Sequence, residues 1–207
     1  MTQQLPMYRR PTVGDLLALA KRKFLEDRFE NIEQLSAELG VSRSVAYKWV
    51  GNSERLLSLV IAQITEDSFS EVCDEVKSKG AMRIVDVLMR LSRKVAALKP
   101  HRRLIERNPE KVLRMITSKA APVQSKAIQL TQALLDEESA HGRLRLPFDS
   151  HTLAYILVRI CESFLYAENI ANEALDFAKE ELALKALLGI SGAAAAPRSQ
   201  RTRPGKR

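Results

Sequence analysis

Two short helical segments joined at a glycine place the strongest constraint on how this chain can fold. The first segment carries apolar residues at helical spacing, including Ile32 and Leu35, and it stops at Gly40. Glycine adopts positive φ without strain, so it commonly ends a helix in the left-handed conformation. Ser42 can then cap a second segment that runs to about Trp49. The sequence therefore predicts a bent pair of helices here, in place of one continuous helix.

The residues of this bent pair suit two helices that cross at a steep angle. Such a crossing needs a small residue where the backbones approach, and Ser36 supplies it. Apolar contacts are available on both sides of the turn from Leu35, Leu39, Val41, Ala46 and Trp49. The same pattern also fits an ordinary corner of a helical bundle with a solvated face. The crossing alone therefore leaves a DNA-reading motif and a purely structural corner open.

The second segment turns polar and basic side chains outward. Arg43, Ser44, Tyr47 and Lys48 lie on the side opposite the crossing. A helix that enters the major groove needs donors and small groups near its N-terminus for base edges, and hydroxyl or ammonium groups for phosphates. The outer side of this segment therefore has the groups that a reading helix requires.

Helical periodicity continues through most of the remaining chain. Thr12 with Asp15, and Asn31 with Gln34, are spaced as capping boxes, which predicts helix starts at both places. A long apolar-periodic run follows Ser53, and further helical runs come after it. No stretch shows convincing alternation of apolar and polar residues, so strands are not expected. These patterns predict an all-α fold of about nine helices.

Charge and cysteine content narrow the class of protein. The net charge is +8, but five of these positive charges belong to the acid-free segment 193–207, so charge gives little support for nucleic-acid binding elsewhere. Cys73 and Cys161 sit in apolar helical patterns, and a disulfide framework is not expected. The sequence shows no secretory signal and no apolar run of membrane-spanning length. We therefore expect a cytoplasmic protein.

The sequence lacks the motifs of common catalytic sites. His101, His141 and His151 do not have metal-ligand spacing, and we expect them at the surface. There is no glycine-rich phosphate loop and no nucleophile elbow. We therefore expect no enzyme activity, no cofactor and no metal.

Residues 13–61 resemble the N-terminal domain of the TetR family of bacterial transcriptional regulators. The matching residues are Ala20 and Phe24, then Leu35-Ser36-x-x-x-Gly40-Val41-Ser42-x-x-x-x-Tyr47, then Glu54-x-Leu56-Leu57. The chain departs from the family in the link over 27–30, which is short and has no glycine, and at Ser53, where a lysine is usual. The link and the run over 47–50 resemble the QsdR-like branch of the family, whose members are associated with lactone-type signals.

The resemblance implies that the chain has three parts. Residues 1–52 would form a DNA-binding domain of three helices with an N-terminal arm. Residues 53–190 would form a helical effector-binding and dimerisation domain, opened by a long connecting helix over 53–79. Residues 191–207 are low in complexity and basic, and we expect a disordered tail.

The resemblance also implies a homodimer that places its two reading helices in successive major grooves of a palindromic operator. The candidate DNA-binding residues are Arg43, Ser44 and Val45 for bases, and Ser42, Tyr47, Lys48, Arg9 and Arg10 for phosphates. Trp49 joins them either as a contact or as a core residue, because its position is an inward one.

The last two long helices, over about 150–188, are the expected dimer interface, packed against their mates as a four-helix bundle. Their apolar residues are Leu153, Leu157, Ile160 and Phe164 on the first, and Ala174, Phe177, Leu182 and Leu184 on the second. Core packing within one subunit would account for the same residues, so both interpretations stay open.

A polar stripe runs along the first of these helices. Tyr155, Arg159, Glu162 and Tyr166 recur at helical spacing. A charge within so apolar a helix is costly to bury unless it is paired, so Arg159 and Glu162 either form a structural pair or orient an effector in a cavity. The candidate effector-binding residues are these four with Met89, Met115, Ile116 and Phe148, although methionines at helical spacing also suit a core.

These features predict a ligand-responsive repressor that binds DNA as a homodimer and is released by a small, largely apolar effector. The effector would favour a dimer geometry in which the two reading helices are wrongly spaced. The alternative is a helical protein-interaction module whose helix-turn-helix does not bind DNA. The low net positive charge of residues 1–60 favours this alternative.

Overall fold

The computed structural model describes residues 9–117 and 122–190, apart from the side chains at 111 and 115–117. These residues form eleven α-helices and no strand, which confirms the predicted all-α fold. None of the helices in the described ranges combines the length and the apolar character that a membrane-spanning segment needs. The helices are α1 (Val13–Leu25), α2 (Ile32–Leu39), α3 (Arg43–Val50), α4 (Ser53–Glu75), α5 (Ala81–Ala97), α6 (Lys99–Arg107), α7 (Pro109–Thr117), α8 (Pro122–Ala140), α9 (Ser150–Leu165), α10 (Ala167–Ala171) and α11 (Phe177–Leu187).

The number of helices exceeds the nine or so expected, in part because the C-terminal region is more interrupted than its periodicity suggests. The first of the two long helices expected over about 150–188 leaves helical geometry at Tyr166 (φ −109°, ψ 18°), so α9 ends there and the short α10 follows. Asn172 adopts a left-handed conformation with φ 53° and ends α10. The last helix therefore begins only at Phe177.

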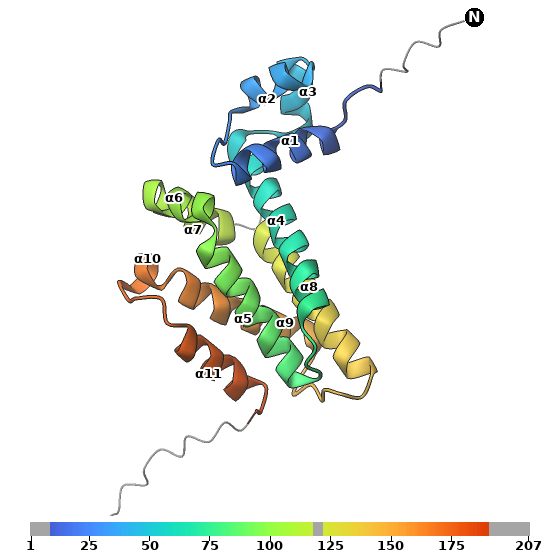
Figure 1. The fold of residues 1–207 in the computed structure, drawn as a ribbon, viewed down its shortest axis with the longest axis vertical. Coiled ribbons are helices and arrows are strands. Elements are labelled where there is room, and N and C mark those ends of the chain that lie inside the picture. Colours follow the sequence, from blue (N-terminus) through green and yellow to red (C-terminus); the bar gives the residue numbers. More distant parts are fainter. Residues whose placement is uncertain (1–8, 118–121, 191–207) are drawn as a thin grey trace, which may run out of the picture.

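α1, α2 and α3 form the predicted helix-turn-helix unit at one end of the molecule (Figure 1). Thr12 and Asp15 form a complete capping box at the start of α1, and Asn31 with Gln34 does the same for α2. α2 ends at Gly40, whose φ of 72° lies in the left-handed region that favours glycine. The local signals in this part of the sequence therefore set the helix boundaries.

Small and apolar side chains close the crossing of α2 and α3. Ser36 and Ala46 are buried, and Ser36 donates its hydroxyl to the carbonyl oxygen of Glu33 at 2.9 Å. α4 completes this core with Leu56 and Val60. The same helix then runs on into the C-terminal half, so one continuous element joins the helix-turn-helix unit to the rest of the chain (Figure 1).

The short link between α1 and α2 is held without a glycine. Asp27 itself takes the left-handed conformation, with φ 60°. Its carboxylate forms an ion pair with Arg103 of α6. Beside it, the buried Lys23 pairs with Glu30 at 3.1 Å and with Glu38 at 2.7 Å. The link therefore attaches the helix-turn-helix unit to α6 and also braces α1 against α2.

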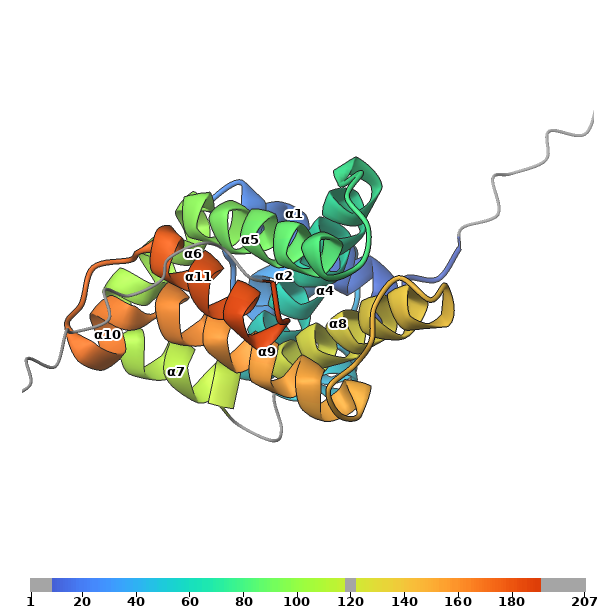
Figure 2. The same cartoon turned by 90° about the horizontal axis from the view of Figure 1, so that it is seen from below.

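In the C-terminal half α5 and α8 pack against α4, and α9 packs against α5 and α8 (Figures 1 and 2). α8 contacts both α4 and α9, and α11 contacts α5 and α9. The core between these helices contains Ile84, Leu135, Leu153, Leu157 and Leu184, all fully buried. Three residues proposed for a dimer interface, Leu153, Leu157 and Leu184, therefore pack inside the subunit, because the helices that they belong to cover one another.

A buried carboxylate joins the start of α5 to the end of α8. Glu138 has no exposed surface, and its Oε2 accepts hydrogen bonds from the Gly80 N–H and from Nε of Arg143, both at 2.7 Å. Its Oε1 accepts from Arg83 at 2.6 Å and from Arg143 at 2.9 Å. Gly80 has φ 62°, and a Cβ there would lie 2.5 Å from the carbonyl oxygen of Arg143. The approach of the chain to Glu138 therefore depends on glycine at this position.

Candidate nucleic-acid interface and internal cavity

The outer side of α3 gathers candidate DNA-binding residues on one surface. Arg43, Ser44 and Lys48 are exposed, and Val45 and Tyr47 keep 37% and 39% of their surface accessible. The buried residues of α3 occupy its opposite side. α3 lies at one end of the molecule (Figure 1). Its polar and basic side chains are therefore open to solvent there.

A carboxylate on the neighbouring helix holds the Tyr47 hydroxyl. The hydroxyl donates a hydrogen bond to Oε1 of Glu33 in α2 at 2.6 Å. This hydrogen bond lowers the pKa of Glu33 and raises the pKa of Tyr47. Sequence analysis missed Glu33, because only the crossing of α2 and α3 brings positions 33 and 47 together. The contact fixes the position of the phenol on the outer side of the unit.

The other candidates in this region have different surroundings. Ser42 caps α3 and accepts a backbone N–H of its first turn at 3.4 Å. Trp49 is half-buried against the core of the helix-turn-helix unit, which matches the core interpretation that the sequence left open. Arg9 and Arg10 are exposed, and a guanidinium nitrogen of Arg9 lies 3.6 Å from a carboxylate oxygen of Asp15.

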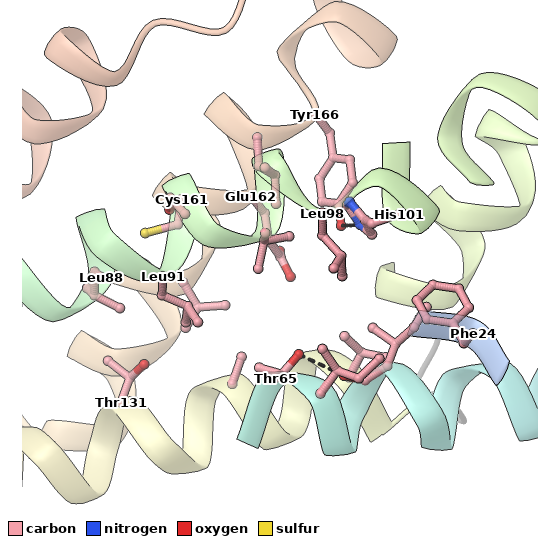
Figure 3. Close-up of a pocket in the computed structure, with 18 residues that line it drawn as sticks. Phe24, Thr65, Leu88, Leu91, Leu98, His101, Thr131, Cys161, Glu162 and Tyr166 are labelled. Carbon is pink, nitrogen blue, oxygen red and sulfur yellow. Dashed lines mark hydrogen bonds between the residues drawn. The ribbon is translucent and has the colours of Figure 1, made fainter. Parts of the chain in front are cut away.

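A cavity that opens to solvent lies between α4, α5, α8 and α9 and is completed by α1 and α6 (Figure 3). Most of its lining side chains are apolar. The lining residues are Phe24, Ile61, Ile64, Thr65, Leu88, Leu91, Ser92, Val95, Leu98, His101, Val123, Ala127, Thr131, Val158, Cys161, Glu162, Leu165 and Tyr166. A cavity with so apolar a wall suits a small, largely apolar ligand.

Two of the candidate effector-binding residues, Glu162 and Tyr166, lie on the cavity wall. The others that the structure describes lie elsewhere: Met89 is buried in the core, and Phe148, Tyr155 and Arg159 are exposed. The side chains of Met115 and Ile116 lie outside the described residues. Helical spacing groups Tyr155, Arg159, Glu162 and Tyr166 in one stripe. In the structure only Glu162 and Tyr166, at the C-terminal end of this stripe, face the cavity.

Glu162 is both paired and part of the cavity wall. Its Oε2 accepts hydrogen bonds from Gln124 and from Arg159, each at 2.9 Å. Burial raises the pKa of this carboxyl group. The predicted ion pair of Arg159 with Glu162 is therefore present. The carboxyl group of Glu162 also faces the cavity.

His101 and Tyr166 form a buried polar pair at one end of the cavity (Figure 3). His101 is only 4% exposed, and its Nε2 lies 3.2 Å from the Tyr166 hydroxyl oxygen. Burial lowers the pKa of His101 to about 4, so the imidazole is neutral near neutral pH. The expectation that His101 lies at the surface is therefore wrong. α6 packs this residue against the end of α9, a long-range contact without a local sequence signal.

The helix-turn-helix unit contributes directly to the cavity wall. Phe24 near the end of α1 lines the cavity. From the other side, Leu98 and Leu104 pack against the core of the helix-turn-helix unit. Together with the ion pair of Asp27 and Arg103, these contacts connect α1 to α6. The helix-turn-helix unit and the cavity wall therefore share Phe24 of α1.

Comparison with known proteins places this arrangement among transcriptional regulators. A family model described as "Tetracyclin repressor-like, C-terminal domain" matches residues 79–189, just over half of the chain. The chain is similar to the TetR-family transcriptional repressor QsdR of R. erythropolis, with 26% identity over 89% of this chain and 99% of that one, and a TM-score of 0.82.

A second solved structure shares the fold alone. It is FadR of Thermus thermophilus, a TetR-family repressor in complex with lauroyl-CoA. The identity is 17% over 94% of this chain and 100% of that one, and the TM-score is 0.56. No curated protein matches the chain.

Proposed function

Because the chain belongs to the TetR family of transcriptional regulators, we propose that it is a repressor whose affinity for DNA is controlled by a small molecule in the internal cavity. The observation that carries this proposal is the outward-facing α3, with Arg43, Ser44 and Lys48 exposed, on a unit whose α1 also lines the cavity. We expect the protein to act in the cytoplasm at the nucleoid, without catalytic activity.

In this proposal α3 enters the major groove of an operator. Arg43, Ser44 and Val45 lie in its first turn, where side chains can reach base edges. Lys48 and the cap residue Ser42 would contact phosphates, with Arg9 and Arg10 contributing charge from the arm. Tyr47 would join them once DNA binding releases its hydroxyl from Glu33, because that hydroxyl has a single hydrogen to donate. Trp49 is left out of the proposed contacts because it packs against the core.

The effector would be small and largely apolar, as the cavity wall is. Lactone-type molecules are among the candidates, because the chain resembles the branch of the family that contains QsdR. An effector that fits one arrangement of α1 and α6 better than another shifts the protein toward that arrangement. Release from DNA then requires that the effector bind the DNA-free arrangement only about 1–3 kcal/mol more favourably than the DNA-bound arrangement.

A gel-shift titration on the promoter region of its own gene tests DNA binding. We expect the logarithm of the affinity to fall linearly with the logarithm of the salt concentration, with a slope of about 0.9 for each neutralised phosphate. The basic segment 193–207 could bind any duplex, so a chain that ends at Gly192 is tested beside the full chain. The shorter chain should keep its preference for the promoter over random duplex.

Loss of all binding on truncation, together with equal binding of promoter and random duplex by the full chain, would show that only the tail binds DNA. Absence of binding by both chains at low salt would favour the alternative function, a helical protein-interaction module whose helix-turn-helix does not bind DNA.

We further propose that the homodimer forms through the outer sides of the C-terminal helices α9 and α11. The inner residues of both helices are already used within the subunit. Tyr155 on α9 and Leu182 on α11 remain 47% and 59% exposed, and the two helices contact each other. Large apolar side chains left exposed on adjacent helices suit a contact between two identical surfaces.

Leu182→Glu is therefore expected to convert the dimer into a monomer at micromolar concentration, because two copies would bring unpaired carboxylates into an apolar contact. Light scattering over a dilution series measures this change. Leu25→Glu is the matched control, since Leu25 is also exposed, at 46%, but belongs to α1. A monomeric wild-type protein, or a dimeric Leu182→Glu variant, would contradict the proposed interface.

A further inference from the structure

Among the described residues that line the cavity, none has a cationic side chain that could neutralise an anionic ligand. These described residues include no lysine and no arginine. Its carboxyl group, Glu162, is already engaged with Gln124 and Arg159. An ionised carboxylate or phosphate in this cavity would lose its hydration without gaining a cation as a partner, which is strongly unfavourable.

Several polar groups of the wall are also occupied within the protein. The Thr65 hydroxyl donates to the carbonyl oxygen of Ile61 at 2.9 Å. The Ser92 hydroxyl donates to Oε1 of the buried Glu180 at 2.6 Å. These hydroxyl groups have already donated their hydrogens within the protein, so toward a ligand they can act only as acceptors.

His101 differs from these groups because one of its ring nitrogens is buried without a partner. Its Nδ1 has no hydrogen bond within the described part of the chain, while Nε2 is next to the Tyr166 hydroxyl. Whichever tautomer is present, the pair keeps one free position at Nδ1 and one at the phenol oxygen. A buried polar atom without a partner is costly, so a ligand group that reaches it gains a favourable hydrogen bond.

We propose that His101 and Tyr166 are the polar anchor of the effector, and that the effector is a neutral amphiphile with an apolar chain and a single hydroxyl or ester head. The apolar chain would lie along Ile64, Leu91 and Val158, and the head would lie at the end of the cavity formed by α6 and α9 (Figure 3). The role of this ligand as an effector rests on the proposed function, whereas the binding preference rests on the cavity itself. Because the His101 imidazole is neutral near neutral pH, it supplies a hydrogen bond and no charge.

Isothermal titration of the full chain with n-decanol, γ-decalactone and decanoate near neutral pH tests this inference. The three probes have the same number of carbon atoms and differ in their heads. Wild type should bind the two neutral probes at least about tenfold more tightly than decanoate. His101→Leu should weaken the neutral probes by about tenfold and leave decanoate unchanged, since that ligand does not use the anchor.

Three further variants separate the anchor from general damage to the cavity. His101→Asn keeps a polar group near Nδ1 and should recover part of the affinity. Tyr166→Phe keeps the ring in place and should weaken the neutral probes less than His101→Leu. Leu91→Met changes an apolar part of the wall, so it should alter all three affinities by the same factor.

Equal or tighter binding of decanoate by wild type would overturn the inference. So would an unchanged preference in folded His101→Leu, or no binding of either neutral probe at about 1 mM. These titrations contain no DNA, so a failed gel shift beside intact binding of the neutral probes would reject the repressor proposal and keep the anchor.

Discussion

Glu138→Ala is expected to lower the free energy of unfolding by about 3–5 kcal/mol, because it leaves two arginines and a backbone N–H without their buried partner. The carboxylate receives four hydrogen bonds of 2.6–2.9 Å from Gly80, Arg83 and Arg143. Urea unfolding followed by circular dichroism measures the change.

Glu137→Ala is the matched control for this experiment. Glu137 is the neighbouring residue and also pairs with Arg83, but its side chain is 46% exposed. Exposed ion pairs contribute little, so this variant should lose no more than about 1 kcal/mol. If the two variants lost similar amounts, the Glu138 cluster would have no special role in stability.

The same carboxylate gives the wild-type protein a defined sensitivity to acid. The hydrogen bond from Arg143, followed by those from Arg83 and Gly80, holds the pKa of Glu138 at about 2, against an ordinary value of 4.5. A pKa below that of the unfolded chain stabilises the folded state fully above pH 4.5. This stabilisation is lost as the pH falls toward 2, so the difference between wild type and Glu138→Ala should narrow over that range.

Local sequence signals were sufficient to predict the helix-turn-helix unit. Each signal involves residues close in the chain: Thr12 with Asp15 at a helix start, Gly40 with positive φ at a helix end, and Ser42 at the next cap. Their geometry is set by the backbone within one turn, so it does not depend on the rest of the fold. The all-α class follows from the same kind of short-range periodicity.

The cavity could not be predicted in this way, because its wall comes from six helices that are far apart in the sequence. His101 lies in a short, mostly charged helix, and only its packing against Tyr166 makes it a buried polar group. Periodicity groups Tyr155 with Glu162 on one side of α9. It does not predict which part of that side is packed against other helices. The structure leaves Tyr155 in solvent and buries most of Glu162.

Arg43→Ala is expected to weaken binding to the operator by about 1–3 kcal/mol for each half-site, or roughly 5-fold to 150-fold, because a bidentate contact from arginine to guanine would be lost. Arg43 is exposed at the first position of α3, the end of a reading helix that meets base edges. Binding to random duplex should change much less, so the ratio of the two affinities should fall. Parallel gel shifts on operator and random duplex measure this ratio.

Lys48→Ala separates base reading from simple attraction to phosphates. Lys48 is exposed on the same helix but in its last turn, where an ammonium group suits a phosphate. Its loss should weaken operator and random duplex by the same factor and reduce the salt slope by about one unit per contact. If Arg43→Ala behaved like Lys48→Ala, the arginine would contribute charge without reading sequence. The discrimination would then have to come from other residues of the first turn, Ser44 and Val45.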